Sequence, residues 1–230
     1  MTQLFKLMLP VLIFVFCSFQ KQNGSNKEVQ VMKAAEGQMD LNLAKIKPGQ
    51  ERNYGFTTFD SMDLCSVGKP YRLLEFTNEF YSGTIDENSN YITITNDWRV
   101  PVVLGSQHRF LFSVSGNPGN YSITGMGDAG LARELQKLSQ STRDSDEFYI
   151  LTIYPLFAEF YGQESNNSFS EIRFIPLASA YIAIPGLRAG ASYTLSEVQD
   201  MVKKAIEARK KPAPVKETPV KPKPKTKVNG

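Results

Sequence analysis

Residues 98–124 read WRVPVVLGSQHRFLFSVSGNPGNYSIT, and this stretch decides the fold. It contains three β-rich runs, which are separated by turn signals at Gly105-Ser106 and at 116–120. The runs are Trp98–Leu104, Arg109–Ser115 and Tyr121–Thr124. In the middle run, Phe110, Phe112 and Val114 recur at every second position, which places them on one face of a strand. Because tight turns join the runs, the stretch predicts an antiparallel meander rather than parallel pairing.

The sequence on either side of the meander predicts further strands. These are Tyr71–Thr77, Tyr91–Thr95, Phe148–Tyr154 and Glu171–Leu177. The polar stretch Gly162–Ser168 is expected to be a loop between the last two of them. Turn signals and strands therefore dominate the centre of the chain.

Three helices are expected among these strands. A short one at Thr57–Val67 would end at Gly68, and a second at Asp128–Ser139 has leucines every three or four positions. The last begins at a capping box of Thr194 and Glu197. Its apolar stripe is formed by Leu195, Val198, Met201, Val202 and Ala205.

The composition of the 230 residues, 41% hydrophobic and 21% charged, is that of a globular protein. The expected fold is α+β, with a largely antiparallel sheet and two or three packed helices. We expect one domain at residues 37–208, which is long enough to bury a hydrophobic core. A disordered basic tail is expected at 209–230, because its prolines and mutually repelling lysines oppose packing.

Residues 1–17 predict export. One positive charge, Lys6, precedes the apolar run Leu7–Phe16, which is shorter than the roughly 20 residues of a membrane-spanning helix. A run of this length is typical of the apolar core of a signal peptide. Residues 18–36 are expected to be a polar tether that joins this segment to the domain.

Cys17 directly follows the apolar run and resembles the lipidated cysteine of bacterial lipoproteins. Phe16 departs from that pattern, which has a small residue before the cysteine. Three outcomes stay open: lipidation at Cys17, cleavage to a soluble product, and an uncleaved anchor. Lipidation would attach the protein to a membrane through its N-terminus.

The charge of the chain is divided unevenly. Residues 209–227 hold eight basic residues and the single acid Glu217, a formal charge of +7, whereas residues 18–208 hold 17 basic and 22 acidic residues. The domain is therefore mildly acidic and carries a basic arm, which argues against a nucleic-acid-binding domain. The arm is expected to bind an anionic surface through its lysines. These are Lys210, Lys211, Lys216, Lys221, Lys223, Lys225 and Lys227.

One glycine pattern suggests a cofactor site. Residues 125–130 read GMGDAG, the spacing of a dinucleotide-binding loop between a strand and a helix. The preceding run is short and polar, and Asp128 would repel an anionic ligand. We expect the glycines to form a tight turn, with Asp128 as the helix N-cap and no cofactor bound.

Other residue types with catalytic chemistry are few. Cys65 is expected to be a small buried hydrophobic residue, and His108 a residue of the surface or of a strand edge. A single histidine and two cysteines argue against the usual zinc sites. The sequence therefore assigns no catalytic, cofactor-binding or metal-binding residue.

Together these features predict an exported bacterial cell-envelope protein, periplasmic or attached to the membrane. Its domain is expected to be a non-enzymatic binding or adaptor module. The expected partner is an anionic envelope surface or an envelope protein. Two alternatives stay open: an exported hydrolase whose site the sequence does not assemble, and a structural subunit of an envelope complex.

Overall fold

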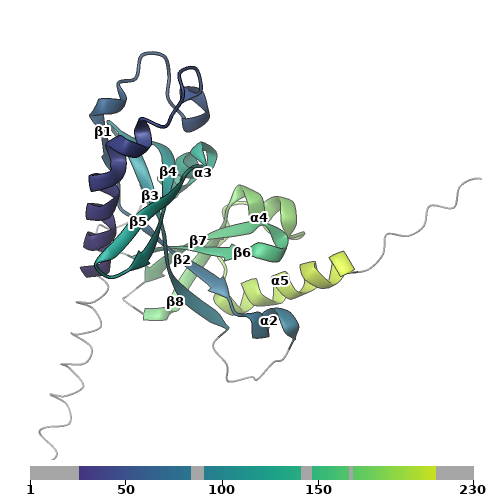
Figure 1. Ribbon diagram of the computed structural model, residues 1–230. Coiled ribbons are helices and arrows are strands. Elements are labelled where there is room, and N and C mark those ends of the chain that lie inside the picture. The colour runs from purple at the N-terminus through teal and green to yellow at the C-terminus, as the bar shows by residue number, and fades with distance from the viewer. Residues whose placement is uncertain (1–25, 84–90, 141–146, 166–167, 211–230) are drawn as a thin grey trace, which may run out of the picture.

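The structure is a computed structural model that describes residues 26–83, 91–140, 147–165 and 168–210 (Figure 1). Its centre is an eight-stranded sheet with the order β5-β4-β3-β2-β6-β7-β8, to which β1 adds by pairing with β3. The strands are β1 (Cys65–Val67), β2 (Tyr71–Phe76), β3 (Ile92–Leu104), β4 (Gln107–Asn117), β5 (Asn120–Gly127), β6 (Phe148–Ile153), β7 (Ala158–Ser165) and β8 (Ser168–Pro176). All strand pairs are antiparallel except β2–β6. The fold is α+β with a largely antiparallel sheet, as the sequence predicts.

The predicted meander is confirmed as β3–β4–β5. The two runs predicted at 91–95 and 98–104 join into the one long strand β3. At the β4–β5 turn, Gly116 has φ 145°, and a Cβ there would lie 2.2 Å from the Asn120 carbonyl oxygen. Only glycine fits this close approach.

Helices cover both faces of the sheet. The N-terminal helix occupies residues 26–43 of the described chain. The other α-helices are α2 (Asn78–Ser82), α3 (Ala129–Ser139), α4 (Ala178–Ala183) and α5 (Leu195–Lys210), and the 3-10 helices are η1 (Glu51–Tyr54), η2 (Met62–Leu64) and η3 (Tyr154–Leu156). In the described part of the chain no helix is both long and apolar enough to cross a membrane.

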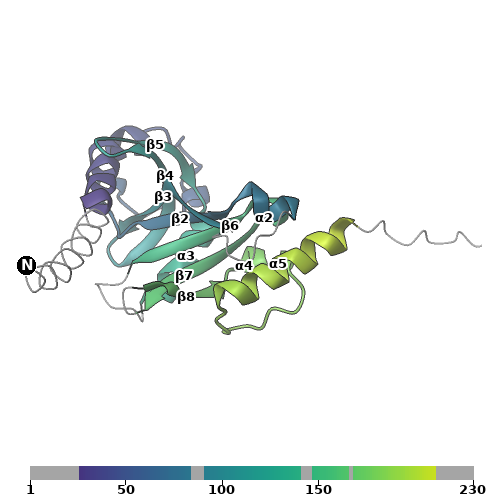
Figure 2. The same cartoon turned by 90° about the horizontal axis from the view of Figure 1, so that it is seen from below.

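Successive side chains on the strands separate the core into layers. Leu73 packs in a cluster with Leu135 of α3, whereas Leu74 packs in a cluster with Val202 of α5. Because neighbouring residues of a strand point to opposite faces, α3 and α5 cover opposite faces of the sheet. The N-terminal helix packs in a third cluster with Trp98 of β3, at the other end of the sheet from α5 (Figures 1 and 2).

The predicted boundary of the domain at residue 37 is wrong. The structure is helical from residue 26, and Val31 and Ala35 are fully buried. Glutamine at position 30, which lies in the expected tether, accepts a hydrogen bond of 2.8 Å from the Gly119 backbone N–H in the β4–β5 turn. Residues 26–36 therefore belong to a helix of the domain and not to a linker.

Two other local predictions are wrong. Residues 57–67 contain the short η2 and β1 instead of one helix. Most of the expected loop at 162–168 belongs to β7, in which Gly162 lies against the Phe174 ring; a Cβ there would meet that ring at 3.1 Å. The last helix is confirmed, since the Thr194 backbone N–H donates to Glu197 Oε2 at 2.7 Å and the Glu197 N–H donates to Thr194 Oγ1 at 3.3 Å.

Candidate functional site

The register of four strands brings charged side chains together on the face of the sheet that carries α3. Arg99 of β3 lies opposite Ser113 of β4 and Tyr71 of β2. On neighbouring strands, Thr152 of β6 lies opposite both Glu75 of β2 and Glu159 of β7. Directly opposed residues share a face of the sheet and have Cβ atoms about 5 Å apart. Asp97, Arg99, Glu75 and Glu159 therefore form one band across β3, β2, β6 and β7, which we name the charged row.

Hydroxyl groups of β4 orient the β3 members of the charged row. The Arg99 guanidinium donates to the Ser113 hydroxyl, and the Ser115 hydroxyl donates to the Asp97 carboxylate. Arg99 Nε is buried and has no hydrogen-bond partner among the described residues. The row thus contains one guanidinium, with a free donor, among three carboxylates.

Burial and neighbouring negative charges raise the pKa of two carboxyl groups of the row, Glu75 and Glu159. The pKa of Glu75 is raised, first by burial and then by the charge of Asp97. The pKa of Glu159 is raised by burial and by Asp128 and Glu134 of the α3 region, while Arg99 acts in the opposite direction. Two acids with a raised pKa on one half-buried face are a typical property of functional sites, and they favour a cationic partner.

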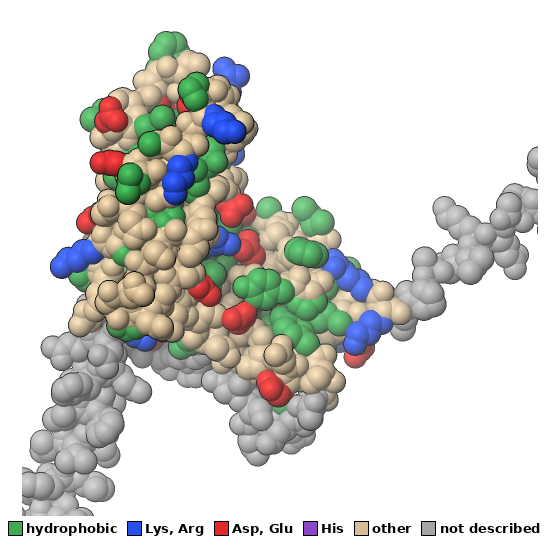
Figure 3. Space-filling view, viewed as in Figure 1, with side chains coloured by type: hydrophobic (Ala, Val, Ile, Leu, Met, Phe, Trp, Pro, Cys, Tyr) green, Lys and Arg blue, Asp and Glu red, His purple; other side chains and the backbone are tan. Residues whose placement is uncertain are grey.

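Exposed apolar side chains lie next to the row at the β6–β7 connection and on α4. We name this set the apolar rim: it consists of Tyr154, Phe157, Tyr181 and Ile182. Phe157 is 84% exposed and Ile182 is 89% exposed. Hydrophobic side chains gather on this part of the molecule, with acidic side chains beside them toward its middle (Figure 3). A surface of this kind is typical of binding sites for another molecule.

The backbone of Phe157 is unusual. It has φ 53° and ψ 42°, the left-handed conformation that bulky side chains rarely adopt. The conformation ends η3 and starts β7, while the ring remains in solvent. A strained, exposed aromatic residue suggests a role other than stability.

The glycine pattern at 125–130 spans the junction of β5 and α3, as predicted, but Gly125 and Gly127 belong to the strand and Gly130 to the helix. Asp128 is the residue before the helix, but it also has a left-handed backbone, with φ 57°, and its side chain makes no capping hydrogen bond. The expected side-chain capping is therefore wrong. The carboxylate instead adds negative charge near Glu159.

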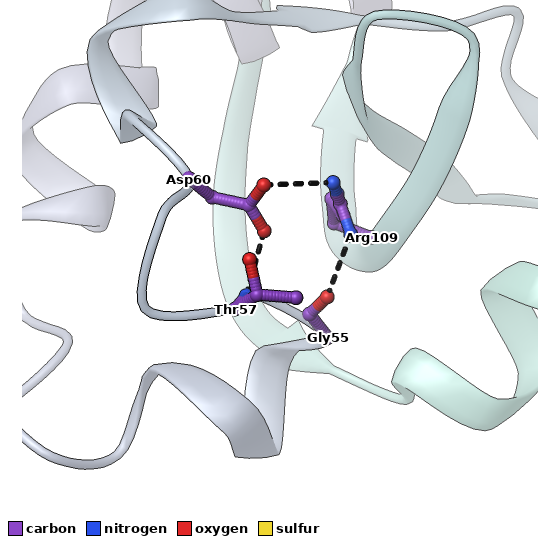
Figure 4. Close-up of polar contacts among 4 residues, drawn as sticks. All are labelled: Gly55, Thr57, Asp60 and Arg109. Carbon is purple, nitrogen blue, oxygen red and sulfur yellow. Dashed lines mark hydrogen bonds and ion pairs between the residues drawn. The ribbon is translucent and has the colours of Figure 1, made fainter.

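A second polar cluster ties the segment after the N-terminal helix to β4 (Figure 4). Arg109 Nη2 donates to Asp60 Oδ1 at 3.1 Å, and Arg109 Nη1 donates to the Gly55 carbonyl oxygen at 3.0 Å. Asp60 Oδ2 also accepts a hydrogen bond of 2.6 Å from the Thr57 backbone N–H. Arg109 Nε is buried without a hydrogen-bond partner among the described residues. Because the three hydrogen bonds all join groups of the fold, the cluster acts as a clamp on residues 55–60.

Cys65 and His108 lie near this clamp. Cys65 is 9% exposed and packs in the core of the β3–β5 half, as predicted, and burial raises the pKa of its thiol. His108 lies at the start of β4, beyond the last residue that pairs with β5, and its pKa is lowered by burial. The predicted position at a strand edge is confirmed, although the ring is half-buried.

The residues that the sequence proposed for binding lie mostly elsewhere. Cys17 and the lysines from Lys211 to Lys227 fall outside the described residues. Lys210 is the exposed last residue of α5. Its neighbour Arg209 donates hydrogen bonds to the Pro155 carbonyl oxygen at 3.1 Å and to the Leu156 carbonyl oxygen at 3.5 Å, next to the apolar rim.

Sequence reasoning missed the charged row. A signal was present, because Glu75 and Arg99 lie within runs that otherwise favour strands, and Asp97 directly precedes one of these runs. The pairing of β2 with β6, which brings Glu159 to the same band, joins residues more than 70 positions apart and follows from no local pattern.

The described residues contain no candidate metal site, and the comparisons with known proteins find no match for the chain. Among the described residues no group of three or more His, Cys, Asp or Glu side chains is placed to hold a metal ion. No protein-family model, curated protein or solved structure matches the chain.

Proposed function

We propose that the chain is an exported cell-envelope protein whose α+β domain is a non-enzymatic binding or adaptor module. Its basic C-terminal segment would bind an anionic surface of the envelope or an envelope protein. The protein would be periplasmic or attached to a membrane through a lipid on Cys17. The segment at residues 1–17 supports export, since a short apolar run behind a positive charge is typical of signal peptides.

One observation carries the binding role of the domain: the half-buried charged row lies beside the exposed apolar rim. The exposed rings of Tyr154 and Phe157 offer apolar area, and the half-buried carboxylates offer fixed charges for orientation. Apolar contact with a few placed polar groups is how proteins bind ligands and peptides specifically.

The charge of the arm supports the second half of the proposal. A lysine near an anionic bilayer contributes about 1 kcal/mol, so the six lysines from Lys211 to Lys227 suffice for reversible attachment. The arm leaves the fold after Lys210, at the end of the domain formed by α5 (Figure 1). An arm at this position can contact a surface without unfolding any described element.

The test compares the full chain with a truncation after Lys210, on vesicles of anionic lipid and of neutral lipid. Ending after Lys210 retains the contacts of Arg209 with η3. A matched control replaces the six lysines from Lys211 to Lys227 with glutamine, which keeps the length and the prolines. We expect the full chain to bind anionic vesicles at least about tenfold more tightly than either variant. Tenfold corresponds to about 1.4 kcal/mol, well below the contribution of six lysines at about 1 kcal/mol each.

Salt separates a charge effect from other binding. The difference should vanish as the Debye length falls from about 10 Å at 0.1 M to about 3 Å at 1 M salt. Equal binding by the three proteins would refute the proposal that the basic segment binds anionic surfaces. Turnover of generic ester, glycoside or peptide substrates by the full chain would replace the binding module with the hydrolase alternative, and stable co-purification with an envelope complex would favour a structural subunit.

A further inference from the structure

We propose that the charged row and the apolar rim are the docking surface for the chain's own C-terminal segment, residues 211–230. The segment would lie across the face of the sheet beside η3, with prolines on the exposed rings and lysines at the carboxylates. The docking itself does not depend on the proposed function. Only its consequence rests on that function: an anionic surface would compete with the domain for the same lysines.

The end of α5 places the start of this segment at the surface. Arg209 donates to the carbonyl oxygens of Pro155 and Leu156, so the last described turn of the chain is fixed to η3. Tyr154 and Phe157 flank those two residues directly and expose 55% and 84% of their surfaces. The segment thus begins beside the two most accessible rings of the β6–β7 connection.

The composition of the segment matches the surface. Pro212-Ala213-Pro214 follows directly after the helix, and proline-rich chains in an extended polyproline conformation dock on exposed aromatic rings. Such a chain lies against the rings at a low entropic cost, because proline has already restricted its backbone.

The charge of the segment is also complementary to that of the surface. The segment has six lysines and one glutamate, whereas the charged row has three carboxylates and one arginine, with Asp128 and Glu134 near Glu159. The lysines at 221, 223, 225 and 227 alternate with other residues and lie roughly 6 Å apart in an extended chain. A carboxylate of the row therefore finds a lysine in nearly any register of the segment.

The segment is long enough to cover the surface. Four neighbouring strands span roughly 15 Å, at about 4.8 Å for each strand spacing. Twenty residues in a polyproline conformation reach roughly 60 Å. Covalent attachment also holds the segment at an effective concentration of the order of 1 mM near the surface, so weak contacts are sufficient.

Hydrogen–deuterium exchange of the full chain, read by mass spectrometry, tests the docking. The comparison uses the truncation after Lys210 and the glutamine variant of the six lysines. At 0.1 M salt we expect peptides covering residues 152–160 and 178–184 to exchange at least about twofold more slowly in the full chain than in either variant. At 1 M salt the three proteins should exchange alike, because the Debye length is then about 3 Å.

A variant of the surface tests the same contact from the other side. Phe157→Asn removes the exposed ring and keeps a residue that tolerates the left-handed backbone. In this variant we expect the protection of peptides 178–184 and of the tail to be reduced, while peptides from α3 and from β4 exchange as before. Unchanged exchange at α3 and β4 shows that the fold is intact.

Three results would overturn the proposal. The first is equal exchange of the full chain and the truncation at 0.1 M salt. The second is protection that persists at 1 M salt. The third is protection that falls when the protein is diluted tenfold, which identifies a second copy as the occupant. None of these results depends on vesicle binding. The exchange experiment therefore tests the docking proposal separately from the proposal that the basic segment binds anionic surfaces.

Discussion

Arg109 on β4 holds Asp60 at 3.1 Å, although 49 positions of sequence separate the two residues. The contact fixes the segment around η2 to the sheet, and the same carboxylate closes a short turn by accepting the Thr57 N–H. The hydrogen bond from Thr57, and to a smaller extent the charge of Arg109, lower the pKa of Asp60 below its usual value of 3.8.

The first prediction follows from that lowered pKa. A carboxyl group with a lowered pKa in the folded state stabilises the fold above its unfolded pKa and stops doing so as the pH falls through the folded value. Asp60→Asn should therefore lower the melting temperature at pH 7. The difference from the unmodified protein should shrink below pH 3.8. Melting curves from pH 2 to pH 7 measure this, and a constant difference across the range would contradict it.

The second prediction concerns the N-terminal helix, which the sequence assigned in part to a tether. Val31 is fully buried, whereas Val29, on the same helix, is 46% exposed. Val31→Asp should destabilise the fold by about 3 kcal/mol or more, because it leaves an unpaired charge in the core. Val29→Asp is the matched control and should change stability by less than about 0.5 kcal/mol. Urea unfolding monitored by the fluorescence of Trp98 measures both changes in stability. Equal effects of the two substitutions would show that the helix does not pack in the core.

The third prediction concerns the strain at Phe157. A bulky residue in the left-handed conformation costs roughly 1 kcal/mol, and the 84% exposed ring regains little of it. Phe157→Asn should therefore leave the free energy of unfolding unchanged or raise it by up to about 1 kcal/mol. A loss above 1 kcal/mol in urea unfolding would show that the ring supports the fold and would weaken its assignment to the docking surface.

The fourth prediction is that residues 1–17 direct export. Deletion of residues 2–16 should leave the protein in the cytoplasm, because the apolar run is the signal that the export machinery recognises. Cell fractionation with an antibody against the domain measures the location. Recovery of the deletion variant from the envelope would refute this role.

The fifth prediction separates the outcomes left open at Cys17. If Cys17 carries a lipid, the native protein takes up labelled palmitate and Cys17→Ala does not. The intact mass of the native protein then gives the cleavage site and the lipid in one measurement. An unlabelled native protein rejects the lipoprotein branch and leaves cleavage or an uncleaved anchor.

Local patterns predicted the parts of the fold that depend on neighbouring residues. The alternation of Phe110, Phe112 and Val114 identifies the strand β4 and its buried face, and Thr194 with Glu197 identifies the start of α5. In both cases the responsible contacts lie within a few positions of the chain. Nothing distant was needed to infer them.

The missed parts depend on distant partners. The first turns of the N-terminal helix bury the small side chains of Val31 and Ala35, and Gln30 accepts a hydrogen bond from Gly119, almost 90 positions away. The charged row exists only because β2 pairs in parallel with β6, which places Thr152 between Glu75 and Glu159. The register between β2 and β6 depends on the assembled sheet, so it cannot be predicted from the sequence of either strand alone.

The parallel pair β2–β6 also determines how the chain can be divided. Every strand that precedes β6 belongs to one half of the sheet, and β6, β7 and β8 complete the other half. A fragment that stops before residue 148 would leave the backbone groups of residues 72–75 without the partners that β6 provides. Such a bare strand edge, which contains the apolar Leu73 and Leu74, is a template for aggregation and for misassembly between chains. We therefore expect that the chain does not divide at this crossover into two modules that fold independently, and that the sheet is completed only after β8 has been synthesised.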